Sequence, residues 1–183
     1  DVRQYRLREL RGRIGVAPQR AALFRGTIRE NLQWGKPGAT DEEITRALTV
    51  AQAADFVFAS PEGLDRHIEQ GGRNLSGGQR QAVALLMATM TPLKFLILDE
   101  HTAALDPTTA EVIMALTDRV IREKHLTAMM VTHNLRYAVE YGDRILMMNR
   151  GRVVLDRAGA EKRATSMDDI LTMFNQISLE TGN

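Results

Sequence analysis

The fold of this chain is decided by residues 95–100, which read FLILDE. Four consecutive apolar residues, Phe95–Leu98, are typical of a strand that is buried inside a parallel sheet. The carboxylates of Asp99 and Glu100 would then lie at the carboxyl edge of that sheet, where open α/β folds bind their ligands. There Asp99 could hold Mg²⁺ through its water shell and Glu100 could polarise an attacking water, although an ordinary loop after a strand looks the same.

Two further strands are predicted, one before and one after this segment. Arg13–Ala17 is a short strand that is followed closely by Gln19, whose neutral amide could reach a metal ion or a water. The apolar run Thr127–Val131 is followed closely by His133, which could donate a hydrogen bond to a phosphate but is more often structural in such a place. Helical patterns separate these strands, so the alternation indicates an α/β fold with a parallel sheet.

Capping patterns predict where the main helices begin. Thr40 with Glu43 opens a helix, and Ser76 with Gln79 opens a second one. One face of the second helix would carry the apolar residues Val83, Leu86, Met87 and Met90. Asp106, directly before a proline, is as readily an N-cap as a functional residue.

The C-terminal part of the chain is expected to form a short helix, a hairpin and a last helix. Asn134–Tyr141 has a helical pattern. Arg144–Met148 and Arg152–Leu155 flank a turn and predict a hairpin. Ser166 would cap an amphipathic helix with an apolar face formed by Met167, Ile170, Leu171 and Phe174.

Residues 75–79 read LSGGQ and stand at the start of a predicted helix. Gly77 and Gly78 would expose backbone N–H groups, Ser76 adds a hydroxyl, and the helix N-terminus adds the positive end of a dipole. Together they form a pocket that suits a phosphate. Taken alone, a Ser-Gly-Gly turn at a helix start is usually only a turn.

Composition narrows the class of protein. The chain has 183 residues, 24 Lys and Arg against 23 Asp and Glu, and no cysteine. A net charge of +1 removes the electrostatic argument for a nucleic-acid binder, and we expect no nucleic-acid partner. The absence of cysteine excludes a disulfide framework, a thiolate zinc site and a cysteine nucleophile. No window reaches the roughly 18 consecutive apolar residues that a membrane helix needs.

In combination these motifs resemble the ATP-binding-cassette (ABC) ATPase family over nearly the whole chain. Leu75–Gln79 is similar to the family's signature sequence, and residues 95–100 are similar to its Walker B strand with the catalytic glutamate. Gln19 matches the Q-loop glutamine, Asp106 the D-loop aspartate and His133 the switch histidine. All five occur in the family's order.

The resemblance implies a fold and a division of the chain. The fold would be a partial P-loop NTPase core with a mainly parallel sheet and an inserted α-helical subdomain. Residues 1–22 would be a part of the ATPase core with the Q-loop, and residues 23–90 the helical signature subdomain. Residues 91–183 would be the part of the core with Walker B, the D-loop and the switch histidine.

The resemblance also implies ATP and Mg²⁺ as cofactors and a role for each matched residue. Asp99 and Gln19 would serve Mg²⁺, Glu100 the lytic water and His133 the γ-phosphate. The nucleotide of a second cassette, packed head to tail, would be bound by the signature residues Leu75, Ser76, Gly77, Gly78 and Gln79. Asp106 would couple the two sites.

By the same resemblance, the chain would work with a transmembrane permease domain or subunit at the cytoplasmic face of the plasma membrane. It would power transport by binding and hydrolysing ATP. Two alternatives stay open: a catalytically incomplete domain that only donates its signature to a partner, and a non-transport ABC ATPase that acts on DNA or ribosomes. The sequence does not indicate which molecule is transported.

One family motif is missing. The P-loop pattern Gly-x-x-x-x-Gly-Lys-[Ser/Thr] does not occur, and the only Gly-Lys pair, Gly35-Lys36, is followed by Pro37. We therefore interpret the chain as N-terminally truncated. We expect it to bind ATP poorly on its own, to hydrolyse it negligibly and to be marginally stable, with sheet strands facing open space.

The two halves resemble different branches of the family. Phe24–Asn31 and Ile68–Asn74 are similar to exporter cassettes, whereas the segment after the signature is more similar to the stand-alone cassette of a bacterial uptake system. A junction near the signature would explain both halves. His101 stands where a small residue is commoner in the family.

Overall fold

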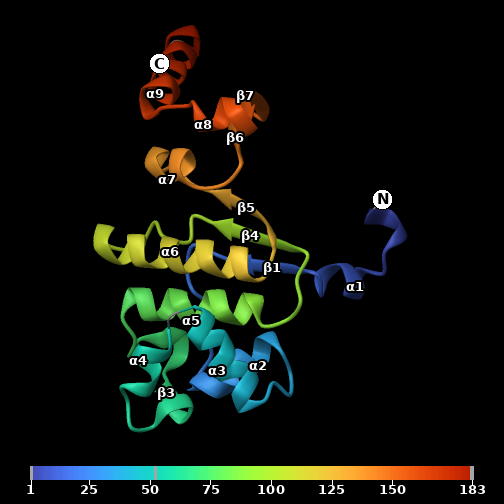
Figure 1. The fold of residues 1–183 in the computed structure, drawn as a ribbon, viewed down its shortest axis with the longest axis vertical. Coiled ribbons are helices and arrows are strands. Elements are labelled where there is room, and N and C mark those ends of the chain that lie inside the picture. Colours follow the sequence, from blue (N-terminus) through green and yellow to red (C-terminus); the bar gives the residue numbers. More distant parts are fainter. Residues whose placement is uncertain (1, 52, 182–183) are drawn as a thin grey trace. The chain divides into compact units, whose positions relative to one another are not determined.

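The computed structural model describes residues 2–51 and 53–181. They fall into two compact units, Asp1–Val131 and Thr132–Asn183, and each is described by itself below. Figure 1 gives the course of the chain through both.

The first unit is built on a three-stranded parallel sheet with the strand order β1-β4-β5. The strands are β1 (Ile14–Ala17), β4 (Phe95–Asp99) and β5 (Thr127–Val131). All three were predicted from their apolar runs, and the α/β class with a parallel sheet is confirmed. β4 is the central strand and pairs with both neighbours. The apolar segment Phe95–Leu98 therefore lies in the middle of the sheet.

Helices and short turns make up the rest of this unit. The N-terminal part forms η1 (Val2–Gln4) and α1 (Leu7–Arg11), whose described side chains are mostly exposed. The following elements are β2 (Gly26–Thr27), α2 (Ile28–Gly35), α3 (Asp41–Val50), α4 (Ala54–Phe58), η2 (Gly63–Asp65), β3 (His67–Ile68), η3 (Gln70–Gly72), α5 (Gly77–Thr89) and α6 (Pro107–Glu123).

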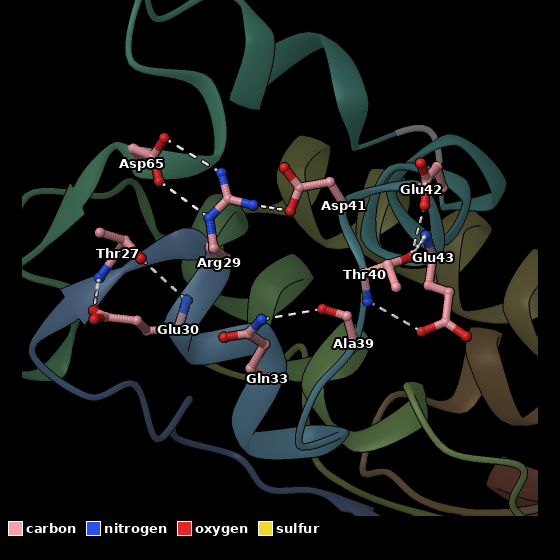
Figure 2. Close-up of polar contacts among 10 residues, drawn as sticks. All are labelled: Thr27, Arg29, Glu30, Gln33, Ala39, Thr40, Asp41, Glu42, Glu43 and Asp65. Atoms are coloured by element: carbon pink, nitrogen blue, oxygen red, sulfur yellow. Dashed lines mark hydrogen bonds and ion pairs between the residues drawn. The ribbon is translucent and has the colours of Figure 1, made fainter.

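The predicted helix starts are confirmed by the hydrogen bonds at their caps. Thr40 and Glu43 form a complete capping box at the start of α3, and Ser76 with Gln79 does the same for α5. The side chain of Asp106 caps α6 by accepting from the Thr109 backbone N–H at 3.0 Å. A further capping box, Thr27 with Glu30, opens α2 and was not predicted; Figure 2 draws it beside that of α3.

Arg29 joins three elements of the helical part of this unit. Its guanidinium donates to Asp65 at the end of η2, with an Nε–Oδ1 distance of 3.1 Å, and also to Asp41 at the start of α3. Figure 2 shows the guanidinium between the two carboxylates. The partners stand 36 and 12 positions away in the chain, so no local pattern could have indicated them.

α5 is the most central helix of this unit. The predicted apolar face is buried at Val83, Leu86 and Met90, but Ala82, Ala84 and Leu85 on other faces are buried as well. The reason is that α5 packs against α2 on one side and against β1 and α6 on the other, as Figure 1 shows. The sequence predicted one apolar face, but α5 is covered on most sides and buries residues beyond that face.

The crossing of α2 and α5 depends on one glycine. A Cβ atom on Gly35 would lie only 2.1 Å from the backbone carbonyl oxygen of Met87. A backbone atom inside a helix cannot move aside as a flexible side chain can, so only glycine allows this close approach.

One face of the parallel sheet is left open by the described residues of this unit. Leu96 and Leu98 on β4 point to the helices and are fully buried. On the other face Val16, Met129 and Val131 are 51%, 47% and 46% exposed. The expectation that Thr127–Val131 would lie against open space agrees with this exposure, whereas the same expectation for Phe95–Leu98 is wrong, because β4 pairs with β1 and β5 and buries Leu96 and Leu98. The open face is unusual because parallel sheets are normally covered on both faces.

The second unit contains α7 (Leu135–Glu140), β6 (Arg144–Asn149), β7 (Arg152–Ala158), α8 (Gly159–Arg163) and α9 (Met167–Thr181). β6 and β7 form the predicted antiparallel hairpin. Its two-residue turn has positive φ at both Arg150 and Gly151, which matches the right-handed twist of the strands.

The core of the second unit is small. It consists of Ile145, Met147, Leu155 and Ile170. Ser166 caps α9 as predicted, because its hydroxyl accepts from the Asp169 backbone N–H at 3.1 Å. Of the predicted apolar face of α9, only Ile170 is buried, whereas Met167, Leu171 and Phe174 are more than 40% exposed. Across the described residues, no helix is both long and apolar enough to cross a bilayer.

Replacing Gly35 by alanine tests the helix crossing. We expect Gly35→Ala to lower the free energy of unfolding by about 2 kcal/mol, because the added methyl group forces α2 and α5 apart. Urea unfolding followed by circular dichroism measures this. Gly12→Ala is the matched control, since a Cβ there would be 3.4 Å from its nearest neighbour and φ is −67°. Equal stabilities of the two variants would contradict the close approach.

Candidate functional site

The carboxyl ends of β1 and β4 bring two predicted site residues together. Ala17, the last residue of β1, lies opposite Leu98 on β4. Gln19 and Glu100 each follow their strand by one or two residues, so both emerge at the same edge of the sheet. Gln19 Nε2 donates a hydrogen bond to Glu100 Oε2 at 3.2 Å, across 81 positions of sequence.

The backbone of Glu100 is held in an unusual conformation. Its φ is +44°, in the left-handed region that costs a non-glycine residue on the order of 1 kcal/mol. Two hydrogen bonds hold it there: its N–H donates to Val131 O at 3.0 Å, and its carbonyl accepts from Ala103 N at 2.9 Å. Strained residues that are fixed in this way are frequent at functional sites.

Asp99 and Gln19 follow the ends of β4 and β1 and carry oxygen atoms of the kind that Mg²⁺ prefers. Asp99 is exposed at the end of β4, and the amide nitrogen of Gln19 faces Glu100, which leaves the amide oxygen for a cation. In the described part of the chain there is no group of three or more His, Cys, Asp or Glu placed to hold a metal. Mg²⁺ is commonly held by one or two protein oxygens, with waters and phosphates as its other ligands.

The signature segment, Leu75–Gln79, forms the N-terminal end of α5. Ser76 Oγ accepts from Gln79 N at 3.2 Å, and Gln79 Oε1 accepts from Ser76 N at 3.1 Å. The serine proton is not used by this box, so the hydroxyl can still donate to an anion. Leu75 is buried in the core, and Arg80 Nη1 donates to its carbonyl at 2.8 Å. Leu75 therefore anchors the segment.

The two signature glycines also lie close to side chains of the segment that leads into and begins α6. A Cβ on Gly77 would lie 3.0 Å from Leu105 Cδ2, and one on Gly78 would lie 2.6 Å from Thr109 Cγ2. The starts of α5 and α6 therefore lie side by side, with Asp106 between these two contacts in sequence (Figure 1). The signature segment and Asp106 are neighbours within the first unit.

Asp106 is an exposed carboxylate that caps α6. The Thr109 hydroxyl and backbone N–H hold the pKa of this carboxyl below its ordinary value of 3.8. The ionised form is therefore the one that stabilises the helix start.

His101 is a buried residue directly after Glu100. Only 2% of it is exposed, and its Nε2 lies 3.0 Å from Thr117 Oγ1 in α6. Burial lowers its pKa to about 4, so the ring is neutral at pH 7. Sequence reasoning recorded His101 only as a departure from the family pattern and missed this contact, because Thr117 stands in the middle of another element.

His133 belongs to the second unit, where it directly precedes Asn134, the N-cap of α7. The side chain of Asn134 accepts from Arg136 N and Tyr137 N at 3.1 and 3.3 Å. The proposed contact of His133 with a γ-phosphate stays a prediction.

A shallow hollow of about 600 Å³ lies on the helical part of the first unit. Its lining includes Arg66, His67, Asn74 and Gln79. It touches the signature segment only at Gln79 and contains none of the sheet-edge residues. The candidate site is therefore defined by the contact between Gln19 and Glu100, which brings groups with the required chemistry together.

Comparison with known proteins gives the class. The family model described as ABC transporter matches residues 1–103, which is 103 of 183 residues. The chain therefore belongs to the ABC transporter family.

Several similar proteins are named as ATP-binding proteins. Over 111 residues the chain is 47% identical to the tyrosine transport ATP-binding protein of Clostridioides difficile, covering 61% of this chain and 44% of that protein. Over 179 residues it is 35% identical to an uncharacterized ABC transporter ATP-binding protein of Sinorhizobium fredii, covering 98% of this chain and 30% of that protein. Over 154 residues it is 36% identical to a putative multidrug export ATP-binding/permease protein of Bacillus subtilis, covering 84% of this chain and 26% of that protein. The matched stretch is thus less than half the length of each of these relatives.

The pH dependence of stability tests the cap on α6. The folded-state pKa of Asp106 is lowered, so its contribution is present above pH 3.8 and is lost as pH falls through the lower folded-state value. We expect the stability difference between wild type and Asp106→Asn to be constant near neutral pH and to change only below about pH 4, as wild type loses stability. Urea unfolding at a series of pH values measures this. A change centred near pH 6 would contradict the assignment.

Proposed function

We propose that the chain is the ATP-binding and ATP-hydrolysing part of an ABC transporter and that it powers transport across a membrane. The observation that carries this proposal is the hydrogen bond from Gln19 to Glu100, beside Asp99, at the carboxyl edge of a parallel sheet. The family match and the names of the relatives support it. The proposed division is the one expected from the sequence: core residues 1–22 and 91–183, with a helical subdomain at 23–90.

Three residues at the sheet edge and His133 of the second unit have proposed roles in this chemistry. Asp99 and Gln19 would hold Mg²⁺, which when bound neutralises charge on the phosphate oxygens. The Glu100 carboxylate accepts a proton from the attacking water, and the amide of Gln19 keeps that carboxylate in place. His133 donates a hydrogen bond to the γ-phosphate.

The signature segment serves the nucleotide of a second cassette. The 183 residues contain no P-loop motif. The groups of the described chain that are best suited to bind a phosphate are the backbone N–H groups of Gly77 and Gly78 and the Ser76 hydroxyl. In a head-to-tail pair they close on ATP that the partner holds, with Leu75 and Gln79 fixing the loop. Asp106, next to these glycines, couples the two sites.

The proposed location is the cytoplasmic face of the plasma membrane, in contact with a transmembrane permease domain or subunit. One relative is named as an ATP-binding/permease protein, which supports this arrangement. The helical part of the first unit, which Arg29 holds together, is the proposed contact surface for the permease.

ATP binding by the purified chain tests how far it acts alone. We expect calorimetry with ATP and Mg²⁺ to give a dissociation constant weaker than about 1 mM, because no P-loop cradles the phosphates. Hydrolysis by the chain alone should stay at background. A dissociation constant near 1 μM would overturn this expectation.

A mixing experiment tests the signature and separates the main proposal from its alternative. We expect the chain to stimulate ATP hydrolysis by a complete cassette whose own signature serine is replaced, and Ser76→Arg to reduce the stimulation more than tenfold. Loss with Glu100→Gln as well supports a catalytic role for this chain. Loss with Ser76→Arg alone supports the alternative in which the chain only donates its signature. No loss with either variant contradicts both.

A further inference from the structure

A buried hydrogen bond ties the residue after Glu100 to the middle of α6. His101 Nε2 and Thr117 Oγ1 are 3.0 Å apart, and both residues are at least 98% buried. A buried polar pair of this kind has no water to exchange with, so losing one partner leaves the other unsatisfied. The contact therefore constrains the distance between the turn after β4 and α6.

The hydrogen-bond partners of Thr117 fix which nitrogen of His101 carries the proton. Thr117 Oγ1 also lies 2.7 Å from the carbonyl oxygen of Ile113, which can only accept. A hydroxyl has one proton, so Thr117 donates to Ile113 and accepts from His101. The neutral ring is thus held as the Nε2–H tautomer with a single orientation toward α6.

The turn that carries Glu100 is held at both ends. On the sheet side, Glu100 N donates to Val131 O at 3.0 Å. On the helix side, His101 bonds to Thr117, which stands 16 positions further along the chain. Between them the backbone of Glu100 has a φ of +44°, and its carboxylate accepts from Gln19. Release of the helix side would let this strained backbone relax toward a common conformation.

We propose that His101 and Thr117 are positioning residues, whose hydrogen bond holds the Glu100 carboxylate against Gln19 at the sheet edge. A small side chain at position 101 could not reach α6, and only backbone contacts would then hold the turn. In this chain the His101 ring reaches Thr117 and adds an oriented hydrogen bond. The catalytic meaning of this device rests on the proposed function, because it matters only if Glu100 acts on a water. The positioning itself is a property of the folded chain.

The wild-type chain offers a first test that needs no variant. Nitrogen-15 spectra of the histidine rings distinguish the two neutral tautomers. We expect His101 to be the Nε2–H tautomer at pH 7. The Nδ1–H tautomer, or a mixture of both in rapid exchange, would overturn the proposal.

Variants test whether the bond holds Glu100. We expect Thr117→Val and His101→Ala to shift the side-chain amide signal of Gln19 and to speed amide exchange of residues 100–105 about tenfold, since a buried hydrogen bond is lost. The effects should be non-additive in the double variant, and Thr117→Ser should restore the wild-type signals.

Thr89→Val is the matched control for a general loss of stability. Thr89 is also fully buried in a helix, and its hydroxyl bonds back to Leu85 O at 2.9 Å, but it has no histidine partner. It should lower stability without moving the Gln19 signal. The same shift with Thr89→Val, or an unchanged Gln19 signal with both Thr117→Val and His101→Ala, would overturn the proposal. These readouts need no ATP, so they decide it even if Glu100→Gln is silent in the mixing experiment.

Discussion

The parallel pairing of β4 with β1 is the constraint on which the rest of the first unit depends. The register places Ala17 opposite Leu98, and this alone makes Gln19 and Glu100 neighbours although 81 positions separate them. A shift of one residue would turn Leu96 and Leu98 away from the helices and would carry both polar residues out of register. The same strand register is therefore needed both to bury Leu96 and Leu98 and to bring Gln19 next to Glu100.

The signature segment combines a ligand-binding geometry with a packing role. Gly77 and Gly78 expose N–H groups at a helix start, and a Cβ atom on either would also come within 3.0 Å of a side-chain atom of Leu105 or Thr109. The hydroxyl oxygen of Ser76 accepts a hydrogen bond in the capping box, and its proton can still be donated to another group. Loss of function in a glycine variant would thus report on packing as well as on ligand binding.

Sequence reasoning located the parts of this chain that are specified locally. Four apolar residues in a row predict β4, and a threonine or serine three residues before a glutamate or glutamine predicts the starts of α3 and α5, because both patterns act within a few residues. It could not find the contacts of Arg29 with Asp41 and Asp65, or of His101 with Thr117, which depend on how separate elements pack. The ribbon of β2 and β3 has two residues in each strand, too few for any period to be detected.

The crossing at Gly35 bears on how such a chain can be assembled during evolution. Gly35 lies in the half that resembles exporter cassettes, whereas Met87, whose carbonyl it faces, lies in the half that resembles uptake cassettes. Segments from two different cassettes could form this interface only if the incoming α2 carried glycine at the crossing. A single methyl group at position 35 therefore limits which α2 sequences can be combined with this α5.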